Sequence, residues 1–282
     1  ADIGLSDVFA DSCDFDVNGV NSDVKDNFGP VQAMGFIVPH DSSQQSISYD
    51  AAYLVYGIGP SAKVSPWDDM GQVFERDYVS GTQRMIARTL QLDPQKLRGT
   101  VTQSSSDEAA LVACAPDPDK AIGILAVDLV QSNRASGTKL LAYQHAGQSC
   151  GYLPDSTATS NDKANVRDGH YFIWGPIHMF THKQSVNPNA QSLIDYVSGV
   201  VPPPAGEGDI FDYWAKAHLV PQCAMRVSRE TDGGDLHRVM PTHPCSCRYE
   251  LAATGKTSCP RCANTPPAEC PVCSADGYCE PP

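Results

Sequence analysis

Up to about residue 220, short apolar runs alternate with segments that favour helices, and this alternation limits the fold more than any other feature. Apolar runs predict strands over residues 1–7, 33–38, 121–130, 139–143 and 171–180. Helix signals predict helices over residues 48–57, 80–90, 106–114, 189–197 and 209–218. Strands and helices in alternation indicate an α/β sandwich.

The character of the chain changes after Pro221. Eight of the eleven cysteines lie between Cys223 and Cys279, separated by Pro, Gly, Ser and Thr, and no helix pattern continues there. Such a segment is typical of a disulfide-stapled module made in an oxidising compartment. Because eleven is odd, one thiol is expected to be free, or to pair with another chain or with a segment outside this sequence.

A zinc site is the alternative for this tail. Three cysteine pairs have zinc-knuckle spacing: Cys245-x-Cys247, Cys259-x-x-Cys262 and Cys270-x-x-Cys273. No tidy set of four ligands is evident, and a further cysteine follows close to the end. We therefore expect disulfides and no metal.

The bulk composition excludes some classes of partner. The formal net charge of -13 argues against nucleic acid, whose phosphates require basic surfaces. No apolar run reaches the length of a membrane span, and no leader opens the sequence, so we expect any signal peptide to have been removed. A small anion remains open as a ligand, because a local Arg and a helix start can oppose the global charge.

The segment Arg76-Asp77-Tyr78-Val79-Ser80-Gly81-Thr82 precedes the predicted helix 80–90. The first N–H groups of a helix lack intrahelical partners, and the helix dipole favours an anion there. Arg76 adds a planar fork that fits a carboxylate or phosphate. We expect an oxyanion site here. The alternative is a plain helix cap, with Arg76 paired with Asp69 or Asp77.

Ser6-Asp7 ends the first predicted strand. An ionised carboxylate only accepts hydrogen bonds, so beside an anion site it would favour a ligand that still carries a proton, such as hydrogen phosphate, and repel sulfate. The alternative is an Asp that caps a turn. The sequence contains no Ser-His-Asp set, paired catalytic carboxylates or phosphate loop, so we expect a binding protein without a cofactor, not an enzyme.

Taken together, these pieces resemble the periplasmic phosphate-binding proteins of ABC transporters, which have the type II binding-protein fold. Asp2-Ile3-Gly4-Leu5-Ser6-Asp7 is similar to that family's Asp-Phe-Gly-Ala-Ser-Asp strand end, and residues 76–82 match its Arg-x-x-x-Ser-Gly-Thr anion site. The resemblance covers about residues 1 to 220. The tail is similar to those of Cys-rich secreted members of the myxobacterial type, and the family's first strand and helix have no counterpart in these residues.

The resemblance implies a two-lobed type II periplasmic-binding-protein-like sandwich with a disulfide-rich C-terminal tail. Lobe 1 would contain residues 1–38 and 174–222, lobe 2 residues 39–173, and the tail residues 223–282. The lobes would close by a hinge near Val38-Pro39 and Ile173-Trp174. The family's phosphate site would map to Ser6, Asp7, Arg76, Ser80, Gly81 and Thr82.

The implied function is secreted or periplasmic binding of inorganic phosphate, with an ABC permease as partner. Asp7 would accept the ligand's proton, Arg76 would neutralise its charge, and the helix start would donate hydrogen bonds. The second hypothesis is a structural subunit of a surface assembly or filament at the cell surface. A neighbouring chain would then supply the missing N-terminal strand.

Overall fold

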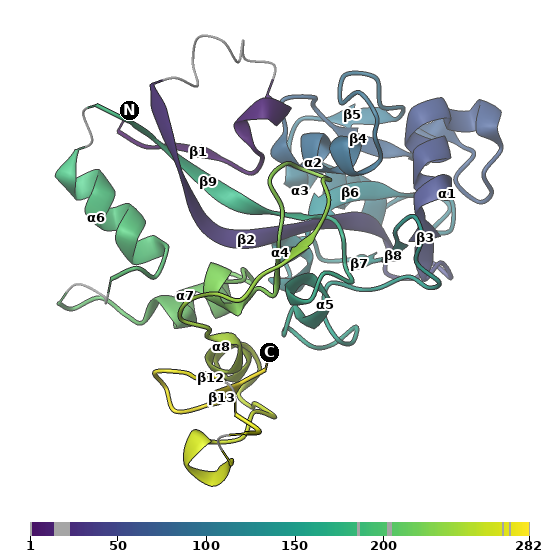
Figure 1. Cartoon of the computed structure of the whole chain (residues 1–282). Coiled ribbons are helices and arrows are strands. Elements are labelled where there is room, and N and C mark those ends of the chain that lie inside the picture. The colour runs from purple at the N-terminus through teal and green to yellow at the C-terminus, as the bar shows by residue number, and fades with distance from the viewer. Residues whose placement is uncertain are drawn as a thin grey trace.

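A computed structural model describes residues 2–13, 23–184, 187–201, 205–266, 268–270 and 272–281. A curled, antiparallel five-stranded sheet lies at its centre (Figure 1), with the order β1-β9-β2-β6 and with β7 also paired to β2. Its strands are β1 (Gly4–Ser6), β2 (Val24–Pro39), β6 (Gly123–Ala126), β7 (Thr138–Leu140) and β9 (Trp174–His182).

The long strand β2 joins two parts of this sheet. Residues 24–33 pair with β9, whereas residues 34–39 pair with β6 and β7. The sequence predicted only residues 33–38 as a strand, because the first half of β2 keeps an exposed polar face and only the second half is buried throughout. The change of partner falls between Ala33 and Met34, while the expected crossing near Val38-Pro39 lies within the pairing with β7.

Two small parallel sheets and five helices accompany the β6 side of the central sheet (Figure 1). The strand pairs are β3 (Ser46–Ser48) with β8 (Ala142–Gln144), and β4 (Phe74–Arg76) with β5 (Thr100–Thr102). The helices are α1 (Tyr49–Tyr53), α2 (Gly81–Thr89), α3 (Ser105–Ala113), α4 (Val127–Gln131) and α5 (Ala164–Arg167). Short 3₁₀ or π turns span Ala10–Ser12, Leu54–Ile58, Gly59–Ala62 and Met70–Gln72.

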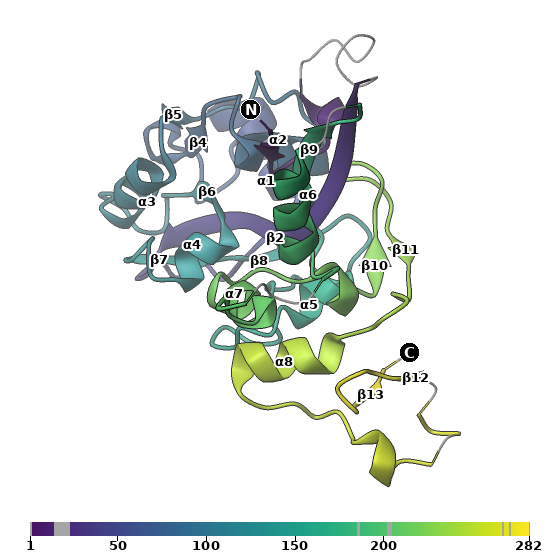
Figure 2. The same cartoon turned by 90° about the vertical axis from the view of Figure 1, so that its left-hand side faces the viewer.

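Helices α6 (Pro188–Val197) and α7 (Ile210–Lys216) follow β9. The tail first passes back along the body of the molecule, where Asp232 accepts hydrogen bonds from the Phe9 N–H and the Ser12 hydroxyl, and from residue 246 onward it lies at one end (Figure 2). The tail contains α8 (Ser246–Thr254), which corrects the expectation that no helix occurs after Pro221. Its remaining elements are two hairpin-like pairs, β10 (Val227–Ser228) with β11 (His237–Arg238) and β12 (Val272–Cys273) with β13 (Cys279–Glu280), and 3₁₀ turns at Gln222–Ala224 and Cys262–Asn264.

Two further predictions need correction. The apolar run 121–130 is not one strand: β6 ends at Ala126, and the chain turns directly into α4, because a buried strand and a short buried helix are equally apolar. Gly175-Pro176 does not interrupt β9, where both residues pair with β2. Helix α3 starts at Ser105 with Ser104 as its cap, close to the predicted start at residue 106.

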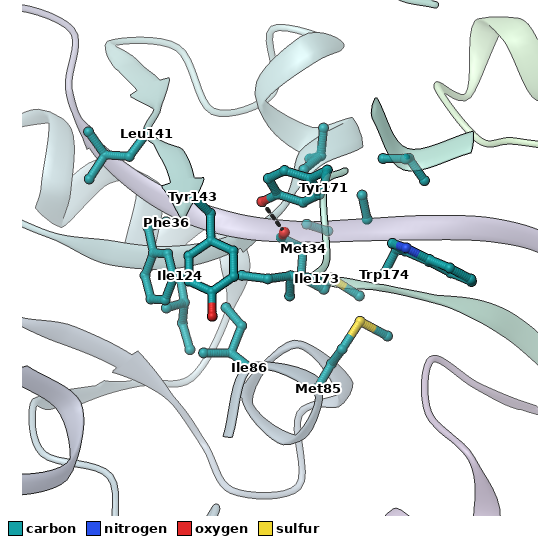
Figure 3. Close-up of a cluster of buried hydrophobic side chains, with 14 of the residues drawn as sticks. Met34, Phe36, Met85, Ile86, Ile124, Leu141, Tyr143, Tyr171, Ile173 and Trp174 are labelled. Atoms are coloured by element: carbon teal, nitrogen blue, oxygen red, sulfur yellow. Dashed lines mark hydrogen bonds between the residues drawn. The ribbon is translucent and has the colours of Figure 1, made fainter. Parts of the chain in front are cut away.

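One main core connects the sheet with the helices (Figure 3). Met34 and Phe36 of β2 pack there with Ile124 of β6 and Ile86 of α2, all of them fully buried. The buried Tyr171 hydroxyl donates a hydrogen bond to the Met34 carbonyl oxygen at 2.6 Å, which satisfies its polar end.

The predicted disulfide tail is confirmed. Four disulfides join Cys223–Cys245, Cys247–Cys259, Cys262–Cys273 and Cys270–Cys279. The zinc alternative therefore fails, because the cysteines with knuckle spacing are oxidised in pairs. Cys114 and Cys150 are exposed thiols outside the tail. In the part of the chain that the structure describes, no helix is long and apolar enough to cross a membrane.

Candidate functional site

A cavity of about 420 Å³ opens where the turn after β1, the end of β4, the start of α2 and the start of α4 converge. Five of the six residues singled out from the sequence line it: Asp7, Arg76, Ser80, Gly81 and Thr82. The rest of the wall was not among the six predicted site residues: Gln32, Asp77, Val79, Gln103, Ser105, Ala126, Asp128 and Leu129. The fold thus gathers residues from five separate segments around one space.

Ser6 is the member of the predicted set that does not line this cavity. Its hydroxyl donates to the Val8 carbonyl oxygen at 2.8 Å and accepts from the Val8 N–H at 3.1 Å. These two bonds close a local turn around Asp7, so the role that the geometry gives Ser6 is to fix that turn.

The start of α2 forms one side of the cavity. Ser80 occupies the N-cap position with an extended backbone, yet its hydroxyl makes no capping hydrogen bond. The first turn of α2 contains no acidic residue that would offset the helix dipole. The hydroxyl of Ser80 and the first amide groups of α2 therefore remain available to an anion.

Gly81 is required by a close approach to Asp7. A Cβ atom at position 81 would lie 2.5 Å from the Asp7 Cβ and 2.6 Å from its Oδ2. The absence of a side chain lets the carboxyl group of Asp7 lie directly against the helix start. Burial raises the pKa of Asp7, the negative charge of Asp128 raises it further, and His178 opposes these effects.

Arg76 ends β4 with its side chain only 12% exposed. Its Nη1 donates to the Ser105 hydroxyl at 2.5 Å, and its Nε lies 3.8 Å from Oε2 of Glu108 without a hydrogen-bond partner among the described residues. The alternative pairing with Asp69 or Asp77 is not observed. The Asp69 carboxylate accepts from Gly71 and Gln72, and Asp77 accepts from the Val79 N–H at 3.0 Å.

Glu108 is the neighbour of Arg76 that sequence reasoning missed. This fully buried carboxyl accepts from the Ile124 N–H at 2.6 Å and from the Thr102 hydroxyl at 3.3 Å. Burial raises the pKa of Glu108 to about 8, so the carboxyl is mostly protonated at neutral pH. A protonated Glu108 does not neutralise the positive charge of Arg76.

Thr82 and Asp128 are two further residues of the wall. Thr82 is buried, and its hydroxyl points to the Met34 sulfur at 3.5 Å, a weak contact that leaves its backbone N–H as the stronger donor. Asp128 lies in the first turn of α4, where its Oδ1 accepts from Nε2 of Gln32 at 2.9 Å. The sequence signal that could have pointed to Asp128 was its place as a single acidic residue inside the apolar run 121–130.

No protein-family model matches the chain, and no curated protein matches it. Solved structures do resemble it. A protein from Clostridium perfringens, assigned as a phosphate ABC transporter substrate-binding protein and solved with bound phosphate, is 15% identical, with a TM-score of 0.58 over 78% of this chain and 79% of that one. An ABC-type phosphate transport receptor from Vibrio cholerae is 12% identical, with a TM-score of 0.54 over 78% and 80% of the two chains.

A phosphate-binding protein from Stenotrophomonas maltophilia is also similar, at 12% identity and a TM-score of 0.51 over 78% of this chain and 76% of that one. These likenesses confirm the predicted fold class: the chain shares the α/β fold of these three proteins, with a disulfide-rich tail added. At such low identity they establish the fold alone.

Proposed function

We propose that this protein binds inorganic phosphate in the cavity at the start of α2, outside the cytoplasm, and that it is not an enzyme. The observation that carries the proposal is the meeting of three kinds of group in one cavity. These groups are a helix start without an acidic residue, the Arg76 guanidinium, and the Asp7 carboxyl held against Gly81.

Each group has a distinct role in this proposal. Arg76 neutralises the anion, while the Ser80 hydroxyl and the backbone N–H groups of Gly81 and Thr82 donate hydrogen bonds to its oxygens. Asp7 accepts the proton of the phosphate and so disfavours sulfate, which has no proton to give. Ser6 supports Asp7 through its turn with Val8 rather than by touching the ligand.

We further propose that two lobes close over the ligand. The lobes are divided as expected from the sequence, residues 1–38 and 174–222 against residues 39–173, with one change. Strand β2 crosses from one lobe to the other between Ala33 and Met34 and not near Val38-Pro39. Strand pairing supports this placement, because Ala33 pairs with Trp174 and the Met34 N–H donates to the Ile173 carbonyl oxygen at 3.0 Å. Both crossings therefore lie side by side, as a hinge requires.

An oxidising location agrees with the four disulfides, and a permease of the ABC type is the partner that the fold suggests. The proposed location is the periplasm or the outside of the cell, including the cell surface. The alternative of a subunit in a surface assembly is not favoured, because the structural neighbours are binding proteins.

Calorimetric titration of the chain with phosphate, arsenate and sulfate tests the proposal. We expect phosphate to bind with a dissociation constant of about 1 µM or below, and sulfate not to bind. Arg76→Ala should weaken phosphate binding roughly 100-fold, because it removes a charge-assisted contact. Asp7→Asn should reduce the discrimination against sulfate.

Arg134→Ala is the matched control, since Arg134 is exposed and lies outside the cavity. Its binding should equal that of the wild type. Absence of phosphate binding by the wild-type chain, or equal losses in the Arg76 and Arg134 variants, would contradict the proposal.

A further inference from the structure

The cavity carries more negative than positive groups for an anion site. Asp7, Asp77 and Asp128 line it, whereas Arg76 is the one basic residue among the described residues of its wall. Other ionisable groups lie behind this wall. Glu108, next to Arg76, is mostly neutral below its pKa of about 8. His178 of β9 lies opposite Ser6 and acts on Asp7, while Lys163 and His218 act on Asp128. An incoming anion therefore meets several carboxylates and one guanidinium.

The three carboxylates are not equivalent. Oδ1 of Asp77 accepts a hydrogen bond from the Val79 N–H within its own turn. Asp128 is oriented by Gln32, whose Nε2 donates to Oδ1, and its second oxygen accepts no hydrogen bond from the described part of the chain. The Asp7 carboxyl likewise accepts none from the described residues. Asp7 and Asp128 thus both present unused acceptor oxygens to the same cavity.

We infer that Asp128 is a second specificity-determining residue, which acts with Asp7 to restrict this cavity to phosphate that carries two protons. This inference rests on the proposed phosphate function and names the ionic form that binds. An ionised carboxylate only accepts hydrogen bonds, so each of the two needs an O–H group facing it.

Dihydrogen phosphate supplies two O–H groups and a single negative charge, which Arg76 balances. Hydrogen phosphate supplies one O–H group and two negative charges. It would leave one carboxylate facing a bare anionic oxygen in a partly desolvated cavity, where like charges repel strongly. Phosphate changes between these two forms near neutral pH. A cavity that binds only the form with two protons should therefore lose apparent affinity as the pH rises.

The experiment is calorimetric titration of phosphate into the chain between about pH 6 and about pH 8.5, for the wild type and for Asp128→Asn. The apparent affinity of the wild type should fall about tenfold for each pH unit once hydrogen phosphate predominates, because one proton must be taken up with the ligand. In Asp128→Asn the amide can donate to a bare oxygen, so the fall should become shallow. Asp212→Asn, an exposed helix residue outside the cavity, should follow the wild type.

A measurement on the wild type alone keeps the inference testable if the Asp128 variant does not fold. Titration at about pH 8 in two buffers of different ionisation enthalpy counts protons, and we expect uptake of about one per phosphate. Phosphate binding without proton uptake, or with the same pH slope in Asp128→Asn and the wild type, would overturn the inference and leave the proposed function standing. Failure to bind phosphate at any pH would remove both.

Discussion

At the scale of single residues, the site depends on contacts between segments far apart in the chain. Gly81 is small because Asp7, more than seventy positions earlier, lies where its Cβ would be. The sequence motif at residues 76–82 predicted an anion site, but not that Glu108 would stand behind Arg76 or that Gln32 would orient Asp128. Such partners come from other elements, and local patterns carry no information about them.

The pH dependence of stability gives a prediction for Glu108. Its pKa is raised by burial from 4.5 to about 8 in the folded protein. Between these values the unfolded chain binds fewer protons than the native state, so the free energy of unfolding should fall as pH rises, by at most about 1.4 kcal/mol per pH unit. Glu108→Gln, which cannot ionise, should flatten this dependence.

Denaturant unfolding of both proteins across that window measures the difference, with Glu207→Gln as an exposed control. If the stability curves of Glu108→Gln and the wild type ran parallel from pH 4.5 to about 8, the buried carboxyl would not be protonated as described.

At the scale of elements, three helices have an N-cap serine, but only two of these serines make a capping hydrogen bond. Ser48 caps α1 by accepting from the Ala51 N–H at 3.2 Å, and Ser104 caps α3 by accepting from the Asp107 N–H at 3.1 Å. Ser80 holds the same position on α2 but makes no such bond. Cap signals in the sequence found Ser48 and Ser80 and placed the start of α3 within two residues of its cap Ser104, while only the three-dimensional arrangement distinguishes the hydroxyl that is left unused.

Two serine variants should accordingly behave in opposite ways. Ser104→Ala should lower the free energy of unfolding by about 1 kcal/mol through the lost cap and leave phosphate binding unchanged. Ser80→Ala should change stability little, since no capping bond is lost, but should weaken phosphate binding. Thermal unfolding and calorimetric titration of the two variants test this, and a stability loss in Ser80→Ala as large as that in Ser104→Ala would count against it.

At the scale of the whole molecule, the tail is part of the core rather than an appendage. Cys245 and Tyr249 are buried in the main hydrophobic cluster together with residues of β2 and α2. The Cys223–Cys245 disulfide fixes the start of α8 to the segment that follows α7, and Arg248 of α8 forms an ion pair with Asp209, the cap of α7.

Removal of this disulfide should therefore affect the stability of the molecule and not only of the tail. The double variant Cys223→Ala/Cys245→Ala should lose about 3 kcal/mol of unfolding free energy, because the disulfide closes a loop in the unfolded chain. Cys114→Ala, which removes an exposed thiol, is the control for loss of a cysteine. Denaturant unfolding that left the double variant as stable as this control would show that the tail is independent of the core.

The sequence by itself determined the α/β class, most helix starts, the disulfide chemistry of the tail and five residues of the cavity, because periodicity, caps, cysteine spacing and the 76–82 motif are all local in the chain. Only the tertiary structure decided the full length of β2, the division of residues 121–130 into β6 and α4, and the presence of Glu108 and Asp128 around Arg76 and Asp7. Those features depend on which surfaces meet in space, where packing between distant segments overrides local preference.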